Sequence, residues 1–180
     1  NTLKQVLYGG SILTEGTSLN ITALKGSDLY VSSNGKTVNV NAPRVLFSPD
    51  DNFILSTKIS TSFSKSYDGG GLLIFENDKK WMKLLFEKFG DGKHGIASTV
   101  TDTYGDDNYH FNIEGDSVFL RIVRKSDVYK LYYSIQGEKW NYLRSFNFPS
   151  SSNLQVGFFS QAPLSDTNKV RFSHATYSQE

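Results

Sequence analysis

Apolar and polar residues alternate along most of this chain, in short runs that predict β-strands. Because successive side chains of an extended strand point to opposite faces, such alternation predicts strands with one buried face. Segments rich in Gly, Asn, Asp and Ser, such as YDGGG at 67–71, separate the runs and predict turns. About a dozen strands spaced in this way predict an antiparallel sandwich or barrel. The clearest runs are residues 52–63, 117–126, 128–137, 153–162 and 170–179.

The segment WMKLLFEKF, residues 81–89, fits two conformations. In a strand, one face carries Trp81, Lys83 and Glu87, and the opposite face is apolar. The same residues also fit an amphipathic helix, because their apolar side chains recur at helical spacing. The turn signal GDG follows at 90–92, and a β-like run comes directly after it. The strand is therefore the favoured interpretation.

Length and charge restrict the protein class. A chain of 180 residues with 38% apolar content predicts one domain, residues 1–180, with a sizeable core. The formal net charge is +1, with acidic and basic residues interspersed, which argues against nucleic-acid or membrane partners. A carbohydrate or other small, weakly charged polar ligand fits this balance better.

Composition also limits the chemistry and the compartment. The chain has no cysteine, so disulfides, thiolate metal sites and a cysteine nucleophile are excluded. No apolar run approaches the ~18 residues of a membrane span, and the first residues lack the apolar core of a signal peptide. Localisation stays open, with the cytoplasm slightly favoured.

Cofactor and metal motifs do not occur in the sequence. No glycine pattern matches a nucleotide-binding loop, and the histidines lack metal-binding spacing. We therefore predict no cofactor and no metal site. Calcium is the least excluded metal, because Asp91, Asp106 and Asp107 lie in turn-like segments; solvated turn carboxylates are the favoured interpretation.

Glycoside hydrolysis remains an alternative and leaves open whether the protein is an enzyme. It normally requires two carboxylates across the scissile bond. Glu87 lies in a strand-like segment, and Asp106 or Asp107 is the best candidate for its partner. The E-x-D-x-x-E strand of many sandwich-fold glucanases is absent.

An ordered set of motifs covers most of the chain, at 42–60, 67–87, 105–108, 119–146, 155–163 and 170–177. From Asp28 to Tyr177 this set resembles uncharacterised bacterial and fungal domains, often labelled "regulation of enolase" proteins, of the concanavalin A-like lectin/glucanase superfamily. The resemblance implies an all-β, antiparallel two-sheet β-sandwich of the jelly-roll kind and no established activity. Asp102, where relatives tend to have a basic residue, and the missing glycine after Pro163 depart from the pattern.

In lectin-like sandwiches ligands usually lie on the concave sheet or at its rim, and the resemblance places the strand at 81–87 among those that line it. An aromatic face, carboxylates, amides and a guanidinium together suit a sugar. The ligand-binding set that we predict is Trp81, Lys83, Glu87, Asp107, Asn108, Arg121, Tyr132 and Gln161.

Each member of this set also has a purely structural interpretation. Trp81 and Tyr132 are as compatible with packing, and Lys83 with Glu87 forms a plain surface pair if that face is exposed. Asp107 and Asn108 are typical turn-capping residues from the loop after the strand, and Arg121 suits a structural ion pair. These alternatives stay open at the level of sequence.

The sequence therefore predicts a non-catalytic β-sandwich domain that binds a carbohydrate or another small polar ligand. One alternative is a glycosidase-type enzyme that uses Glu87 with Asp106 or Asp107. The other is a protein-interaction module that regulates a metabolic enzyme, for which a flat apolar patch is expected instead of a polar cavity.

Overall fold

The computed structural model describes residues 2–180, and these fold entirely into strands, turns and loops. Between residues 2 and 180 no helix is long and apolar enough to cross a membrane. The strands are β1 (Lys4–Val6), β2 (Ser11–Glu15), β3 (Ser18–Leu24), β4 (Leu29–Val31), β5 (Val38–Val40), β6 (Arg44–Phe47), β7 (Asn52–Thr61), β8 (Gly69–Asn77), β9 (Lys80–Lys88), β10 (His94–Asp102), β11 (Tyr104–Asn112), β12 (Ser117–Lys125), β13 (Val128–Ser134), β14 (Asn141–Asn147), β15 (Gln155–Gln161) and β16 (Thr167–Gln179).

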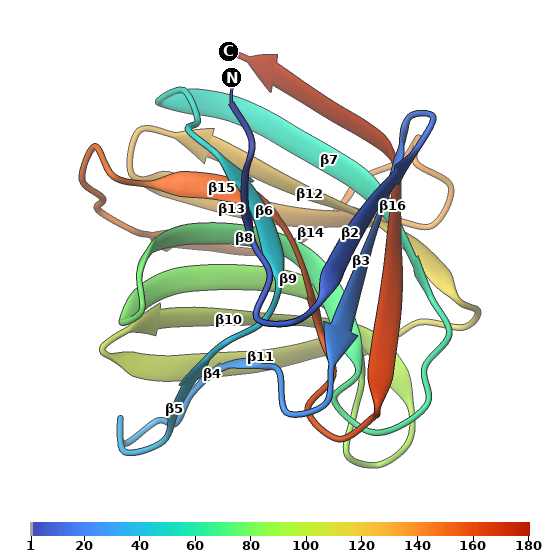
Figure 1. Cartoon of the computed structure of the whole chain (residues 1–180). Coiled ribbons are helices and arrows are strands. Elements are labelled where there is room, and N and C mark those ends of the chain that lie inside the picture. The colour runs from blue at the N-terminus through green and yellow to red at the C-terminus, as the bar shows by residue number, and fades with distance from the viewer. Residues whose placement is uncertain (1) are drawn as a thin grey trace.

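Two seven-stranded antiparallel sheets pack face to face (Figure 1). Sheet I has the order β1-β6-β15-β8-β9-β10-β11, and sheet II has the order β14-β13-β12-β7-β16-β3-β2. In both sheets strands far apart in the sequence pair side by side, as in jelly rolls. The predicted two-sheet β-sandwich is confirmed.

Each of the five clearest alternating runs coincides with a strand, namely β7, β12, β13, β15 and β16. The segment at 81–89 is the strand β9, so the strand interpretation is confirmed and the helical one is wrong. Two predicted irregular segments are corrected. The GDDN stretch at 105–108 lies inside β11, and Gly69–Gly71, expected in a turn, begin β8. Both stretches are paired along their length with neighbouring strands, which satisfies their backbone groups.

The core between the sheets takes one face of β9. Met82, Leu84 and Phe86 are fully buried there, together with side chains from sheet II such as Ile59 and Leu120. Truncating an apolar side chain at such a position lowers the stability of the fold, because protein cores are close-packed. This face is the dry face that the sequence pattern predicted.

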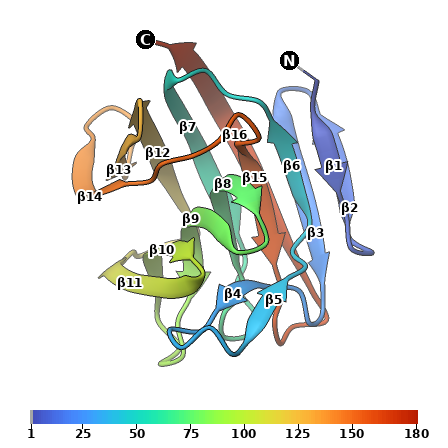
Figure 2. The ribbon, with the colours of Figure 1, turned by 90° about the vertical axis from the view of Figure 1, so that its left-hand side faces the viewer.

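The other face of sheet I is also covered over part of its area. Residues 27–42, named here the cover segment, contain the two-stranded sheet β4-β5 and lie against it (Figure 2). Leu29 and Val31 of this segment form a second apolar cluster with Trp81 and Leu85. The expectation of an open polar face on β9 is therefore corrected, since residues 81–87 are buried on both sides.

Candidate functional site

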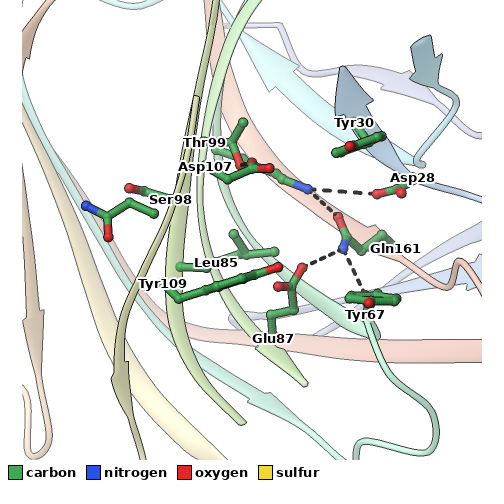
Figure 3. Close-up of a pocket in the computed structure, with 13 residues that line it drawn as sticks. Asp28, Tyr30, Tyr67, Leu85, Glu87, Ser98, Thr99, Asp107, Tyr109 and Gln161 are labelled. Atoms are coloured by element: carbon green, nitrogen blue, oxygen red, sulfur yellow. Dashed lines mark hydrogen bonds and ion pairs between the residues drawn. The ribbon is translucent and has the colours of Figure 1, made fainter. Parts of the chain in front are cut away.

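A cavity of about 300 Å³ lies between the cover segment and the outer face of sheet I (Figure 3). It is at the lower end of the ~300–1,000 Å³ usual for small-molecule sites. The lining residues are Asp28, Tyr30, Tyr67, Lys83, Leu85, Glu87, Ala97, Ser98, Thr99, Asp107, Asn108, Tyr109 and Gln161.

Strand register brings the polar residues of the cavity together. Gln161 of β15 pairs with Gly69 of β8, and Gly69 pairs in turn with Glu87 of β9. Because Gly69 has no side chain, Gln161 and Glu87 meet above it. Beyond the row of Leu85 and Ala97, Lys83 pairs with Thr99, which pairs with Asp107 of β11. Strand pairing in sheet I therefore fixes the positions of Gln161 with Glu87 and of Lys83 with Asp107.

A buried hydrogen-bond chain connects Lys83 to Glu87. The Lys83 ammonium donates to Gln161 Oε1 at 3.0 Å, and Gln161 Nε2 donates to Glu87 Oε2 at 3.1 Å (Figure 3). Gln161 Nε2 also donates to the carbonyl oxygen of Tyr67 at 2.8 Å, which fixes the orientation of the amide. Buried polar groups that are held in this way have few alternative arrangements.

The cover segment supplies a third member of this network. Asp28 Oδ1 lies 3.8 Å from the Lys83 ammonium. The backbone N–H of Asp28 donates to the Asn41 side chain at 2.9 Å, and the N–H of Leu29 donates to Asp28 Oδ1 at 2.8 Å. Burial raises the pKa of the Asp28 carboxyl, although the Lys83 charge opposes this effect.

Glu87 is the most perturbed acid of the cavity. Its side chain and backbone are only 6% exposed, and this burial raises its pKa from 4.5 to about 7. The Lys83 charge and the Gln161 hydrogen bond lower the pKa, whereas the Asp28 and Asp107 carboxylates raise it. Near neutral pH the cavity therefore holds Glu87 in both protonation states.

Tyrosine side chains enclose the polar groups. Tyr109 projects from β11 toward the Glu87 carboxyl, while Tyr30 and Tyr67 lie on the opposite side of the cavity (Figure 3). Burial, followed by the Glu87 and Asp107 charges, raises the pKa of Tyr109 to about 12. Its phenol therefore stays protonated and can donate a hydrogen bond.

Five of the eight predicted binding residues line the cavity, namely Lys83, Glu87, Asp107, Asn108 and Gln161. Asp107 is held by the Thr99 hydroxyl, which donates to Asp107 Oδ1 at 2.6 Å. Strand alternation directs the Asn108 side chain to the opposite face from Asp107. The loop expected to carry Asp107 and Asn108 is the strand β11, so the sheet itself positions both residues.

Trp81 does not line the cavity, in contrast to the prediction. It lies on the expected face of β9, but it is 0% exposed beneath the cover segment. Its indole N–H donates to the carbonyl oxygen of Asp78 at 3.2 Å. The packing alternative considered for Trp81 describes this environment.

Arg121 and Tyr132 belong to sheet II, away from the cavity. Arg121 donates to the Ser56 hydroxyl at 2.7 Å, and its guanidinium lies 3.8 Å from the centre of the Trp140 ring. Tyr132 packs edge-on against another tyrosine of β14. The expectation that these residues share a site with Glu87 is therefore corrected, because strand alternation predicts the face of a strand and not its sheet.

The acids proposed as partners of Glu87 separate in the same way. Asp107 lines the cavity, but the exposed Asp106 pairs with Val100 and lies on the opposite face of β11. The pairing of Glu87 with Asp106 is thus wrong. Within residues 2–180 no group of three His, Asp or Glu side chains is placed to hold a metal ion. Asp91 accepts a hydrogen bond from the Lys93 N–H in the turn after β9.

Sequence reasoning missed several lining residues. Thr99 pairs with Lys83 and Tyr109 pairs with Ala97, so knowledge of the strand register would have located both residues at the cavity. Asp28, Tyr30 and Tyr67 lie outside the paired strands of sheet I. No local pattern marks these three, because only the path of the chain brings them to the cavity.

The two sheets and the arrangement of their strands define a concanavalin A-like β-sandwich, with folds of glycoside hydrolases among its structural neighbours. The chain belongs to the family described as "Protein of unknown function (DUF1349)", whose model matches residues 11–180. The confirmed family resemblance thus covers nearly the whole chain.

Two similar proteins come from Saccharomyces cerevisiae. "Regulation of enolase protein 1" is 25% identical over 124 residues, which make up 67% of this chain and 61% of the yeast protein. The match therefore spans less than two thirds of that relative. The crystal structure of a functionally unknown yeast protein has a TM-score of 0.90 at 18% identity, over 99% of this chain and 96% of that chain.

A more distant structural match is a variant of the GH43 protein BlXynB from Bacillus licheniformis. Its TM-score is 0.74 at 15% identity, and the match covers 91% of this chain and 33% of that chain. At such identities the two solved structures establish the shared fold. The chemistry of the cavity has to be argued from its own residues.

Proposed function

We propose that this protein binds a carbohydrate through one sugar unit held in the cavity on sheet I. The observation that carries the proposal is the buried chain Lys83–Gln161–Glu87, whose polar groups converge on a concave space bounded by tyrosines. Small-molecule sites typically combine such a concavity with a few oriented polar groups.

The lining matches the surface of a sugar. Tyrosine rings offer apolar faces for pyranose C–H groups, and carboxylate and amide groups accept or donate hydrogen bonds in fixed directions. Because Gln161 is held at both ends of its amide, it fixes the Lys83 ammonium and the Glu87 carboxyl in place before any ligand arrives. This preorganisation reduces the entropy cost of binding.

The fold neighbours give general support. Proteins of the GH43 class, among them a glycoside hydrolase, contain a region of the same fold. In those proteins the matched region is about a third of the chain. That likeness concerns architecture, so the specific sugar has to come from experiment.

The test is a glycan-array screen of the purified protein, followed by isothermal titration calorimetry with each hit. Gln161→Leu removes both amide contacts to Lys83 and Glu87, and we expect it to weaken binding at least about tenfold, equivalent to ~1.4 kcal/mol. Arg121→Ala on sheet II is the matched control and should bind normally. If the folded protein binds no glycan on a broad array, the proposal is refuted.

A second candidate function is glycoside hydrolysis, favoured by the raised pKa of Glu87 in the same cavity as Asp107. A carboxylic acid with a pKa near 7 suits a general acid, and a second carboxyl group in the same cavity suits the partner role. Assays with the array hits as substrates decide this. If the native protein releases sugar products and Glu87→Gln does not, the protein is a glycosidase. If the glycans stay intact, the protein binds them without hydrolysing them.

The protein-interaction alternative draws on the name of the yeast relative, "Regulation of enolase protein 1". A site of that type is expected to be flat and apolar. The cavity on sheet I is concave and polar, which favours a small ligand there. Pull-down from a lysate, compared between the native protein and Gln161→Leu, tests whether any protein partner depends on this site.

A further inference from the structure

The charges around the cavity are unequal, with three carboxylates against one ammonium group. The acids are Asp28, Glu87 and Asp107, and the base is Lys83. Lys83 is already matched by Asp28, whose carboxylate lies 3.8 Å away. Within residues 2–180 neither Glu87 nor Asp107 forms an ion pair. The carboxyl groups of the cavity therefore outnumber its cationic groups, and a cation bound beside Glu87 would favour the ionised form of that residue.

One oxygen of Glu87 is free to meet a ligand. Gln161 donates to Oε2, and among the described residues none donates to Oε1, although the residue is only 6% exposed. Figure 3 shows this carboxyl group directed into the cavity, between Tyr109 and Gln161. A buried carboxylate that lacks a cation is costly, so a donor from the ligand would stabilise it.

The tyrosines around the cavity favour a positive charge as well. The faces of aromatic rings attract cations, and sites for ammonium groups commonly combine such rings with carboxylates. Tyr30, Tyr67 and Tyr109 all line this cavity. An anionic sugar would instead place a like charge beside Glu87 and Asp107, which is unfavourable in a partly buried site.

We propose that the sugar unit bound in this cavity is an amino sugar, whose ammonium group lies beside Glu87 and Asp107. This inference rests on the proposed function, since it specifies the ligand of the same site. The hydroxyl groups of the ring lie beside Lys83 and the tyrosines of the cavity, and the ammonium group supplies the positive charge opposite the two acids.

Calorimetric titrations at about pH 7 test the proposal, because the amine is then largely charged. The ligands are cationic D-glucosamine, neutral N-acetylglucosamine and glucose, and anionic glucuronic acid. Choline serves as an ammonium ion without a sugar ring. We expect glucosamine to bind at least about tenfold tighter than each of the others.

Two isosteric variants assign the preference to residues. Glu87→Gln and Asp107→Asn remove charge with little change in shape, and each should abolish most of the preference for glucosamine over glucose. Asp102→Asn removes an exposed acid at the end of β10, outside the cavity, and should retain the full preference. Circular dichroism checks that every variant is folded.

The possible outcomes separate this inference from the proposed function. Equal binding of glucosamine and glucose, or tighter binding of glucuronic acid, would overturn the amino-sugar assignment and leave carbohydrate binding standing. Equally tight binding of choline would show an ammonium site that ignores the sugar ring, and would overturn it too. If no sugar binds to folded protein, both proposals fail.

Discussion

Gln161 donates a hydrogen bond to Glu87 although the strands of the two residues are not neighbours in sheet I. The strand β8 runs between them, and its residue at this level is Gly69. The absence of a side chain on Gly69 is what allows the amide and the carboxyl to meet. The contact between Gln161 and Glu87 therefore depends on a glycine at position 69.

Substituting this glycine should damage both stability and the site. A Cβ atom at Gly69 would lie 2.6 Å from the carbonyl oxygen of Phe86, a backbone atom fixed by strand pairing. We expect Gly69→Ala to lower the free energy of unfolding by about 1–3 kcal/mol, measured by urea denaturation. At Gly90 the added atom would meet only the flexible end of Tyr67, so Gly90→Ala should cost less. Equal losses would contradict this argument.

The stability of the protein should fall as the pH rises between about 4.5 and 7. Burial raises the pKa of Glu87 from 4.5 to about 7, so the folded state holds this proton more tightly than the unfolded state. The resulting stabilisation is fully present below about pH 4.5 and is lost by about pH 7, with a total of about 3 kcal/mol. Thermal melts over this range measure it.

The isosteric variant Glu87→Gln isolates the contribution of this group. The variant has no proton to lose, so its melting temperature should decline less over the same range and exceed that of the native protein above about pH 7. Parallel pH profiles for the two proteins would show that Glu87 is not the group responsible.

The two tryptophans should differ in their importance for folding. Trp81 is fully buried in the cluster between sheet I and the cover segment, so Trp81→Ala should cost about 3–5 kcal/mol. Trp140 stacks on Arg121 on sheet II and is half-buried, so Trp140→Ala should cost only about 1 kcal/mol. Chemical denaturation compares them, and a larger loss for Trp140 would reverse the assignment.

Neighbouring acids on β11 offer a matched test of the ligand site. Asp107→Asn changes the cavity, whereas Asp106→Asn changes the opposite face of the same strand. We expect the first variant to weaken sugar binding about tenfold and the second to leave the Kd within about twofold. Calorimetry with an array hit provides the measurement. A stronger effect of Asp106→Asn would place the ligand elsewhere.

The strand pattern predicts much of the architecture and about half of the site. Alternation along β9 correctly places Lys83 and Glu87 on one face, because that relation depends only on the two-residue period. It cannot tell that Arg121 lies on the other sheet, since sheet membership depends on long-range pairing. Asp28 and Tyr30 escape prediction for the same reason.

Trp81 illustrates a different limit. Its face on β9 follows from the alternation, yet its burial depends on the cover segment, some forty positions earlier in the chain. Whether a face is exposed is a property of everything that packs on it. A period-2 pattern therefore indicates direction and leaves open what covers each side.

The cover segment gives the two halves of the cavity different freedom to vary. Sheet I supplies Lys83 and Glu87 from paired strands, where most substitutions disturb a ladder or the core. Residues 27–42 supply Asp28 and Tyr30 from a separate segment, which a bridge between Ser27 and Ala162 joins to the chain just after β15. Substitutions in this one segment can therefore change the lining of the cavity while both large sheets keep their sequence.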